Sequence, residues 1–168
     1  MAVHEKAGLF DISHMGEVHC TGFNALGNLD YIMTNDFSNM NDGQVCYTLM
    51  APRMGGCIDD LLIYKYKEND YCINLNASNT EKDFKWMLEH QFGDCEFTNL
   101  SAEISQIAFQ VPNAVKVLEK LATSKCLDLK YYRADFYTEI QGIPCVISRT
   151  GYTGVVGFLK FMPSMRMP

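Results

Sequence analysis

Two adjacent carboxylates, Asp59 and Asp60, are the residues of this chain whose type and position could most directly do chemistry. They follow a Gly55-Gly56 turn and begin an apolar, strand-like run over 61–66. Strand interiors are depleted in Asp, and two neighbouring carboxylates disfavour each other's ionisation. A buried or half-buried pair could therefore transfer protons or bind a cationic or N–H-rich group. The alternative is that one Asp caps the turn and the other faces water, because Asp is a common turn residue.

A glycine-rich stretch, residues 151–157, is a second candidate for a binding loop. No Gly-Lys-Ser/Thr follows it, as a phosphate-binding P-loop would require. A strand-like segment rather than a helix comes next, which disfavours a dinucleotide-binding motif. On spacing alone, the pattern is more typical of a hairpin turn whose glycines supply positive φ angles.

His14 and His19, with Asp11 and Cys20 nearby, could suggest a metal site. The two histidines are five residues apart, which would place them on opposite faces of a strand. Core or surface histidines are therefore the favoured interpretation, and no metal site is expected.

Several large side chains flank the acidic and glycine-rich motifs, and an aromatic-lined pocket with a few polar anchors would suit a flat heteroaromatic ligand. High Met and aromatic content more often reflects core packing, so both interpretations remain open. The flanking residues are Met15, Tyr47, Tyr64 and Tyr152.

The elements that must position these residues are short strands mixed with a few helices. Helical spacing of apolar residues predicts a helix over 23–33, and Ser78 to Glu81 has the S-x-x-E form of a capping box before a second helix. Pro112 suits the first turn of a third helix that extends to about residue 121. Strand-like runs occupy 17–21, 45–50, 61–66, 71–76, 104–111, 143–148 and 155–161.

Strand pairs follow one another through short turns as well as through helices, which predicts an α+β fold with largely antiparallel sheets and flanking helices. In particular, 45–50, 57–66 and 71–76 are expected to pair antiparallel. A continuous parallel sheet through these segments would contradict this prediction.

Composition limits the classes of partner. The chain has 168 residues, of which 48% are hydrophobic and 20% charged, as in a globular domain. A net charge of −6 without a Lys/Arg cluster argues against nucleic acid. No apolar run approaches the ~20 residues that span a bilayer, so no membrane partner is expected. Seven cysteines without a CxxC pair, and no signal-peptide pattern, predict reduced thiols in the cytoplasm.

Seven collinear motifs resemble those of the glycine cleavage system T-protein family, the aminomethyltransferases. The resemblance covers almost the whole chain, and the order and spacing of the motifs make it specific. The motifs begin at Gly8-Leu9-Phe10-Asp11, Met33-Thr34-Asn35-Asp36, Asp42-Gly43, Gly55-Gly56-Cys57-Ile58-Asp59-Asp60, Asn76-Ala77-Ser78-Asn79, Ile107-Ala108-Phe109-Gln110 and Ser148-Arg149-Thr150-Gly151.

The resemblance implies a folate-binding fold and a reaction. Family members take an aminomethyl group from the lipoyl arm of H-protein, release ammonia and form 5,10-methylenetetrahydrofolate, so tetrahydrofolate would be the cosubstrate and lipoylated H-protein the partner. Asp60 matches the family's key carboxylate, and Asp60 rather than Asp59 is expected to point into the site. The residues that match folate-contacting positions are Met15, Tyr47, Tyr64, Asn76 and Tyr152, with Tyr131-Tyr132 matching a tyrosine pair near the glutamyl tail.

The chain also departs from the family pattern. Two family glutamates are replaced by Val155 and Leu159, and the second is the acid expected to bind the pterin N–H groups. Relative to a typical member the chain starts late and ends early, which implies a single incomplete folate-binding domain over 1–168 from a truncated member. Three alternatives remain: an aminomethyltransferase or a piece of one, a folate-fold binding module without transfer activity, and a truncated remnant.

Overall fold

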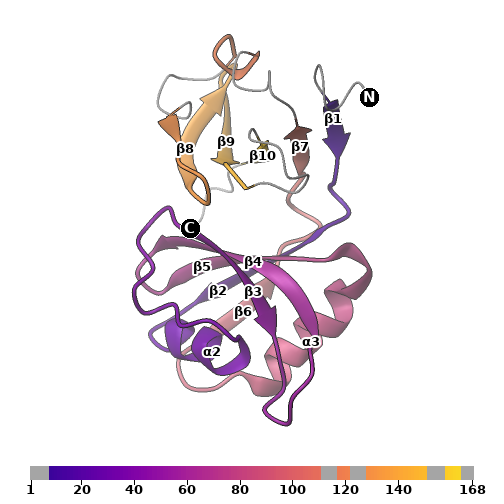
Figure 1. The fold of residues 1–168 in the computed structure, drawn as a ribbon, viewed down its shortest axis with the longest axis vertical. Coiled ribbons are helices and arrows are strands. Elements are labelled where there is room, and N and C mark those ends of the chain that lie inside the picture. Colours follow the sequence, from indigo (N-terminus) through magenta and orange to yellow (C-terminus); the bar gives the residue numbers. More distant parts are fainter. Residues whose placement is uncertain (1–7, 111–116, 122–127, 151–157, 164–168) are drawn as a thin grey trace. The chain divides into compact units, whose positions relative to one another are not determined.

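The computed structural model describes residues 8–110, 117–121, 128–150 and 158–163, and the chain forms two compact units (Figure 1). One unit is His14–Glu103, and the other combines Met1–Ser13 with Ile104–Pro168. The glycine-rich stretch 151–157, with Tyr152 and Val155, lies outside the described residues. So does most of the helix predicted after Pro112.

The His14–Glu103 unit is built on an antiparallel sheet in the order β3-β4-β5-β2-β6. Alternating burial in most of these strands gives the sheet one face for a core and one face of mixed polarity. The strands are β2 (Gly16–Thr21), β3 (Val45–Met50), β4 (Asp59–Lys67), β5 (Asp70–Leu75) and β6 (Glu96–Asn99).

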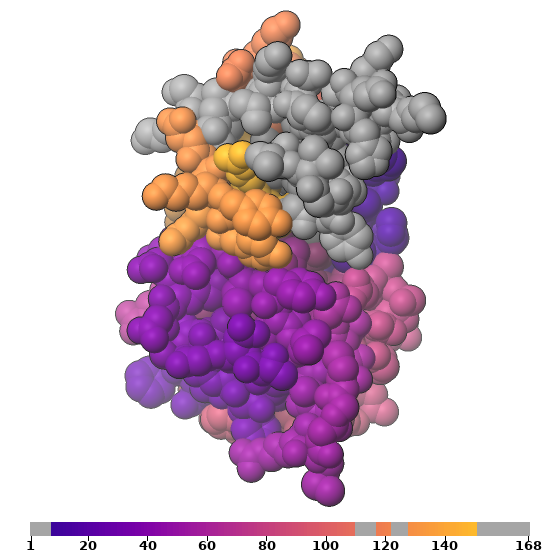
Figure 2. Space-filling view, in the orientation of Figure 1, coloured from indigo at the N-terminus to yellow at the C-terminus, as the bar shows by residue number. Residues whose placement is uncertain are grey.

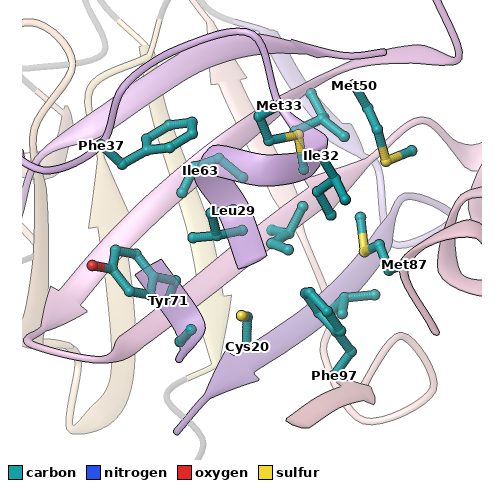
Figure 3. Close-up of a cluster of buried hydrophobic side chains, with 14 of the residues drawn as sticks. Cys20, Leu29, Ile32, Met33, Phe37, Met50, Ile63, Tyr71, Met87 and Phe97 are labelled. Atoms are coloured by element: carbon teal, nitrogen blue, oxygen red, sulfur yellow. The ribbon is translucent and has the colours of Figure 1, made fainter. Parts of the chain in front are cut away.

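Two helices, α2 (Ala25–Ile32) and α3 (Thr80–His90), contribute side chains to the core of this unit. Figure 3 shows Leu29 and Ile32 of α2 and Met87 of α3 among side chains from all five strands. Leu29 and Met87 are fully buried. The core therefore lies on the helix-covered face of the sheet, and the opposite face is free to carry polar chemistry.

Side-chain amides attach α2 to the chain that follows α3. The buried Asn28 donates from Nδ2 to the carbonyl of Phe92 at 2.9 Å, and its Oδ1 accepts from the Phe92 N–H at 2.9 Å. Asn24 Oδ1 accepts from the Asp94 N–H at 2.9 Å. These hydrogen bonds satisfy backbone groups of the loop after α3, which belong to no regular element.

The loop between β3 and β4 extends from the sheet, and its magenta atoms project in Figure 2. Met54 at its tip is 97% exposed, and Gly55 and Gly56 have φ angles of +91° and +99°. The glycine turn before Asp59 therefore has the positive φ angles that glycine tolerates best.

The other unit contains an antiparallel sheet in the order β1-β7-β10-β9-β8. Leu118, Phe136 and Ile147 are among its buried side chains. Its strands are β1 (Gly8–Asp11), β7 (Ile107–Gln110), β8 (Ala134–Ile140), β9 (Ile143–Ser148) and β10 (Phe158–Pro163).

The predicted α+β fold with antiparallel sheets is confirmed, including the pairing of β3, β4 and β5. The predicted capping box is wrong. A short 3-10 helix, η1 (Ala77–Asn79), precedes α3, and the N-cap residue is Asn79 without a side-chain cap hydrogen bond. Among the described residues, no helix is long and apolar enough to cross a membrane.

Candidate functional site

The two acids of the Asp-Asp motif lie on opposite faces of β4. Asp59 pairs with Met50 of β3 and is 8% exposed on the helix-covered face, with Leu61 two residues further along. Asp60 pairs with Leu49 and is half-buried on the other face. The predicted alternation is therefore confirmed, and Asp60 is the acid on the face away from the helices.

A tyrosine from the neighbouring strand orients the Asp60 carboxylate. The hydroxyl of Tyr47 in β3 donates to Asp60 Oδ2 at 2.7 Å, a short hydrogen bond typical of an O–H donor and an ionised acceptor. The Tyr47 side chain is 49% exposed. The hydroxyl is committed to Asp60, while part of the side chain remains accessible to a ligand.

Asn76, which follows β5, joins the two acids. Its Nδ2 donates to the backbone carbonyl of Asp60 at 2.8 Å and to Asp59 Oδ1 at 3.0 Å. An amide nitrogen has two hydrogens, so these two bonds use both. The 3.4 Å contact from Nδ2 to Asp60 Oδ1 is correspondingly weak. Asn76 therefore fixes the backbone at Asp60 and leaves most of its carboxylate free to accept from a ligand.

Asp83 of α3 adds a carboxyl group behind the site. Burial, a hydrogen bond with Asp59 and the charge of Asp59 raise the pKa of Asp83 to about 7. Burial alone would raise the pKa of Asp59 too, but hydrogen bonds with Asp83, Asn76 and Asn79 hold it below its ordinary value. Below about pH 7 the proton of this pair therefore resides on Asp83.

A row of buried polar side chains continues the Asp60 face across the sheet. Glu17 of β2 is fully buried, with Oε1 2.6 Å from Asn74 Nδ2 and Oε2 3.1 Å from Cys72 Sγ. The register places Tyr47, Leu62, Asn74 and Glu17 opposite one another on successive strands. Burial, with contributions from Cys72 and Glu17, raises the pKa of nearby Tyr66.

Sequence reasoning missed this row. Glu17 alternates with apolar Val18 and Cys20, a pattern that is equally typical of an acid on a solvated sheet face. The signal available in the sequence was Asn74, which interrupts the strand-like run 71–75 of otherwise largely apolar residues.

Two further predicted residues belong to this unit. Tyr64 is fully buried on β4, on the same face as Asp60 because the two are four positions apart in the strand. Met15 is half-buried and precedes Gly16, whose register partner Leu75 comes directly before Asn76. The register therefore places Met15, Asn76 and Asp60 in one region of the unit.

The other predicted residues do not lie in this unit. Tyr132 belongs to the β8–β9 unit, where its ring packs edge-on against Tyr131 with centroids 4.6 Å apart. The Tyr132 backbone has a positive φ of 57°. A hydrogen bond of 2.8 Å from the Tyr132 N–H to the Arg149 carbonyl fixes its position next to the end of β9. Tyr152 lies outside the described residues.

The two histidines of the candidate metal site, His14 and His19, lie in different surroundings. His14 is exposed and precedes β2, while His19 Nε2 lies 2.8 Å from Asp70 Oδ1. Across the described ranges no group of three His, Cys, Asp or Glu residues could hold a metal ion.

The geometry defines what the Asp60 region can do. An oriented carboxylate with spare acceptor capacity can bind N–H donors, stabilise positive charge that develops next to it, or accept a proton. The partly exposed Tyr47 side chain supplies an aromatic surface beside the carboxylate.

Two solved structures have a similar fold and differ in how similar their sequences are to this chain. The glycine cleavage system aminomethyltransferase T from Bartonella henselae is 30% identical with a TM-score of 0.81, covering 95% of this chain and 42% of that one. The heterotetrameric sarcosine oxidase from Corynebacterium sp. U-96 is 14% identical with a TM-score of 0.70, covering 94% and 75%, and shows the fold alone.

Curated relatives are closer in sequence. An aminomethyltransferase from Bacillus cytotoxicus is 46% identical over 94% of this chain, and one from Caldanaerobacter subterraneus is 45% identical over 97%. This chain spans 43% and 44% of their respective lengths. The family model for the GCVT N-terminal domain matches residues 1–166, and the chain therefore belongs to that family.

Proposed function

We propose that this chain provides the folate-facing carboxylate of an aminomethyltransferase of glycine catabolism and one-carbon metabolism. The substrates would be tetrahydrofolate and the aminomethyl group on the lipoyl arm of H-protein. The relatives' name, the match to the GCVT N-terminal domain and the geometry around Asp60 support the proposal. Catalysis would depend on Asp60, and folate binding on Met15, Tyr47, Tyr64, Asn76, Tyr132 and Tyr152.

The chemistry gives Asp60 a defined task. The carbon–nitrogen bond of the aminomethyl group breaks and ammonia leaves, which makes the carbon electrophilic. Folate N5 attacks this carbon, the carbon–sulfur bond then breaks, and N10 closes the methylene bridge. The protons lost from N5 and N10 end on ammonia and on the lipoyl thiol. A fixed carboxylate would orient the folate, stabilise the developing positive charge and receive a proton in transit.

One observation carries this proposal: the short hydrogen bond between the Tyr47 hydroxyl and Asp60, beside the Asn76 amide that holds the Asp60 backbone. A carboxylate that only capped the preceding turn would need no tyrosine from a second strand. Positioning by groups on β3 and after β5 is what a reacting carboxylate requires.

Binding without transfer and a truncated remnant are the alternatives to transfer, and Leu159 favours both over transfer. The residue stands where the family resemblance places a pterin-binding glutamate, and in β10 its register partner is Phe109. Leucine cannot make the charge-assisted hydrogen bonds that a carboxylate offers to pterin N–H groups, which are worth about 1.5–3 kcal/mol.

An assay with aminomethyl-loaded, lipoylated H-protein and tetrahydrofolate separates these functions. The aminomethyltransferase proposal predicts methylenetetrahydrofolate and ammonia in equal amounts, and their loss in D60N. Tetrahydrofolate binding without turnover would support the binding module. Absence of both would support the remnant alternative. L159E should tighten folate binding if that position faces the pterin, and V155L, outside the binding role argued here, serves as its control.

We also propose a cytosolic location. The support is the state of the cysteines: in the described residues all are free thiols, including Cys20 and Cys95 whose sulfurs lie 3.8 Å apart. Cysteines without a disulfide framework are typical of proteins from a reducing compartment.

A further inference from the structure

A pair of carboxyl groups lies on the helix-covered face behind the Asp60 site. Asp83 of α3 is fully buried and Asp59 of β4 is 8% exposed. The nearest cation is Lys82, whose Nζ lies 3.4 Å from Asp83 Oδ1 but also donates to the Ile58 carbonyl at 2.9 Å. Two buried acids with one shared, partly exposed lysine cannot both be ionised without a large desolvation cost.

The oxygens of the pair show where a proton is needed. Among the described residues, no N–H or O–H group donates a hydrogen bond of ordinary geometry to Asp59 Oδ2 or to either Asp83 oxygen. A proton on Asp83 resolves this, because the carboxylic acid then donates to Asp59. Asp59 remains an anion, and its other oxygen, Oδ1, accepts from Asn76 Nδ2 at 3.0 Å.

The same Asn76 nitrogen connects Asp59 to the Asp60 site. Its second hydrogen bond, at 2.8 Å, is to the backbone carbonyl of Asp60. An amide side chain can rotate by half a turn and exchange its oxygen and nitrogen. An ionised Asp59 permits only the orientation in which nitrogen faces both acids. The placement of the Asp59 carboxylate, which the proton on Asp83 stabilises, therefore helps to hold Asn76 and, through it, the backbone at Asp60.

We infer that Asp83 is a positioning residue for the Asp60 site: as a neutral acid it holds Asp59 as an anion, which orients Asn76 and thereby Asp60. No contact of Asp83 with a substrate is implied. The inference rests on the proposed function only for its effect on folate, since the orientation of Asn76 is a property of the free protein.

Loss of the Asp83 proton should weaken the arrangement. The groups that face the pair are Asp59 and the Asp60 backbone on β4, Asn76 and Asn79 before α3, and Lys82 on α3. Of these, Lys82 alone opposes the rise in the pKa of Asp83 to about 7. As pH rises through this value the two carboxylates repel each other, and the hydrogen bond from Asp83 that holds Asp59 next to Asn76 is lost.

Four forms of the full chain test the inference: wild type, D83N, D83L and E81Q. Asn is isosteric with a protonated Asp and donates to Asp59 at every pH, whereas Leu cannot donate. Glu81 is exposed on the same helix and serves as the control. Tetrahydrofolate affinity, measured by calorimetry at about pH 6 and about pH 8, should fall about tenfold with rising pH in wild type and E81Q. It should be independent of pH in D83N and weak at both pH values in D83L.

A second readout does not depend on folate. In nitrogen-15 NMR spectra, the Asn76 side-chain amide signals should shift through about pH 7 in wild type and E81Q, but not in D83N. A D83N variant that keeps the wild-type titration would overturn the inference, even if D83L does not fold. If wild type binds no folate while the Asn76 signals behave as expected, the proposed function fails and the positioning role of Asp83 stands.

Discussion

A single hydroxyl group on β3 sets the direction of the Asp60 carboxylate. The Tyr47 hydroxyl lies 2.7 Å from Asp60 Oδ2, and its removal leaves the ring in place. Y47F should therefore weaken tetrahydrofolate binding by about tenfold, the usual effect of losing a hydrogen bond to a charged group. The melting temperature should change little, because the side chain is 49% exposed.

Calorimetry and a thermal melt on the same preparation check this prediction. Y137F is a matched control, because Tyr137 is 89% exposed and lies in the other unit. Equal affinity of Y47F and wild type would show that the hydroxyl does not position Asp60 for the ligand.

The Asp83 carboxyl should also make stability depend on pH in a defined direction. Its pKa is raised from 3.8 in the unfolded chain to about 7 in the folded one. The folded state therefore holds more protons between these values, and its stability falls as pH rises through this window. Asp59, with its lowered pKa, acts in the opposite direction and only at more acid pH.

Urea unfolding at about pH 5 and about pH 7.5 measures the effect. Wild type and E81Q should lose stability relative to D83N as the pH rises. A constant difference between wild type and D83N would contradict the raised pKa.

Elements with a clear period and sufficient length could be predicted from the sequence. The 45–50 and 143–148 strands have the predicted bounds, and 61–66 and 71–76 differ only by a few residues at their ends. The strands β1 and β6 have four residues each, too short for a pattern to repeat. The strand β8 is absent from the prediction, although its buried residues Ala134, Phe136 and Thr138 alternate as in a strand.

The site was only partly predictable, because the sequence pattern indicates which face of a strand a residue lies on but not how a helix packs on that face. Strand alternation indicated that Asp59 and Asp60 diverge, and the family resemblance pointed to Tyr47 and Asn76. Neither strand alternation nor the family resemblance could show that Asp83 contacts Asp59. Asp83 lies 23 residues beyond Asp60 in the sequence, and the contact depends on how α3 packs on the sheet. The capping-box prediction failed because η1 places Asn79, not Ser78, at the N-cap.

The turn between β2 and α2 depends on a glycine. Gly22 has a φ of +111°, and a Cβ atom there would lie 2.5 Å from the backbone carbonyl oxygen of Asp94. Gly55 has a φ of +91° but open space around it. Alanine at either position has an unfavourable positive φ, which destabilises both variants. Only G22A also brings a Cβ atom into a clash with the backbone.

We therefore expect G22A to lower the free energy of unfolding by about 1–3 kcal/mol more than G55A, the usual range for overpacking. Urea unfolding of the two variants checks this. An equal decrease in the free energy of unfolding of the two variants would show that the backbone near Asp94 can move away at no energetic cost.

The division of the chain into two units has a consequence for folding. The His14–Glu103 unit contains a complete five-stranded sheet, both helices and its own core. A fragment over 14–103 should fold alone with a cooperative thermal transition, since an independent core is what defines a domain. Circular dichroism and dispersed NMR signals test this. A fragment that stays unfolded would show that this core is insufficient without the rest of the chain.

The binding of tetrahydrofolate by the full chain and by its D60N variant tests the central claim most directly. Asn has the size of Asp but lacks the charge, and D36N provides a control at an exposed acid outside the site. We expect calorimetry to show micromolar or tighter binding by wild type and D36N, and binding weaker by at least about tenfold in D60N. Equal affinity of D60N and wild type, or no binding by wild type, would contradict the assignment of Asp60 as the folate-facing carboxylate.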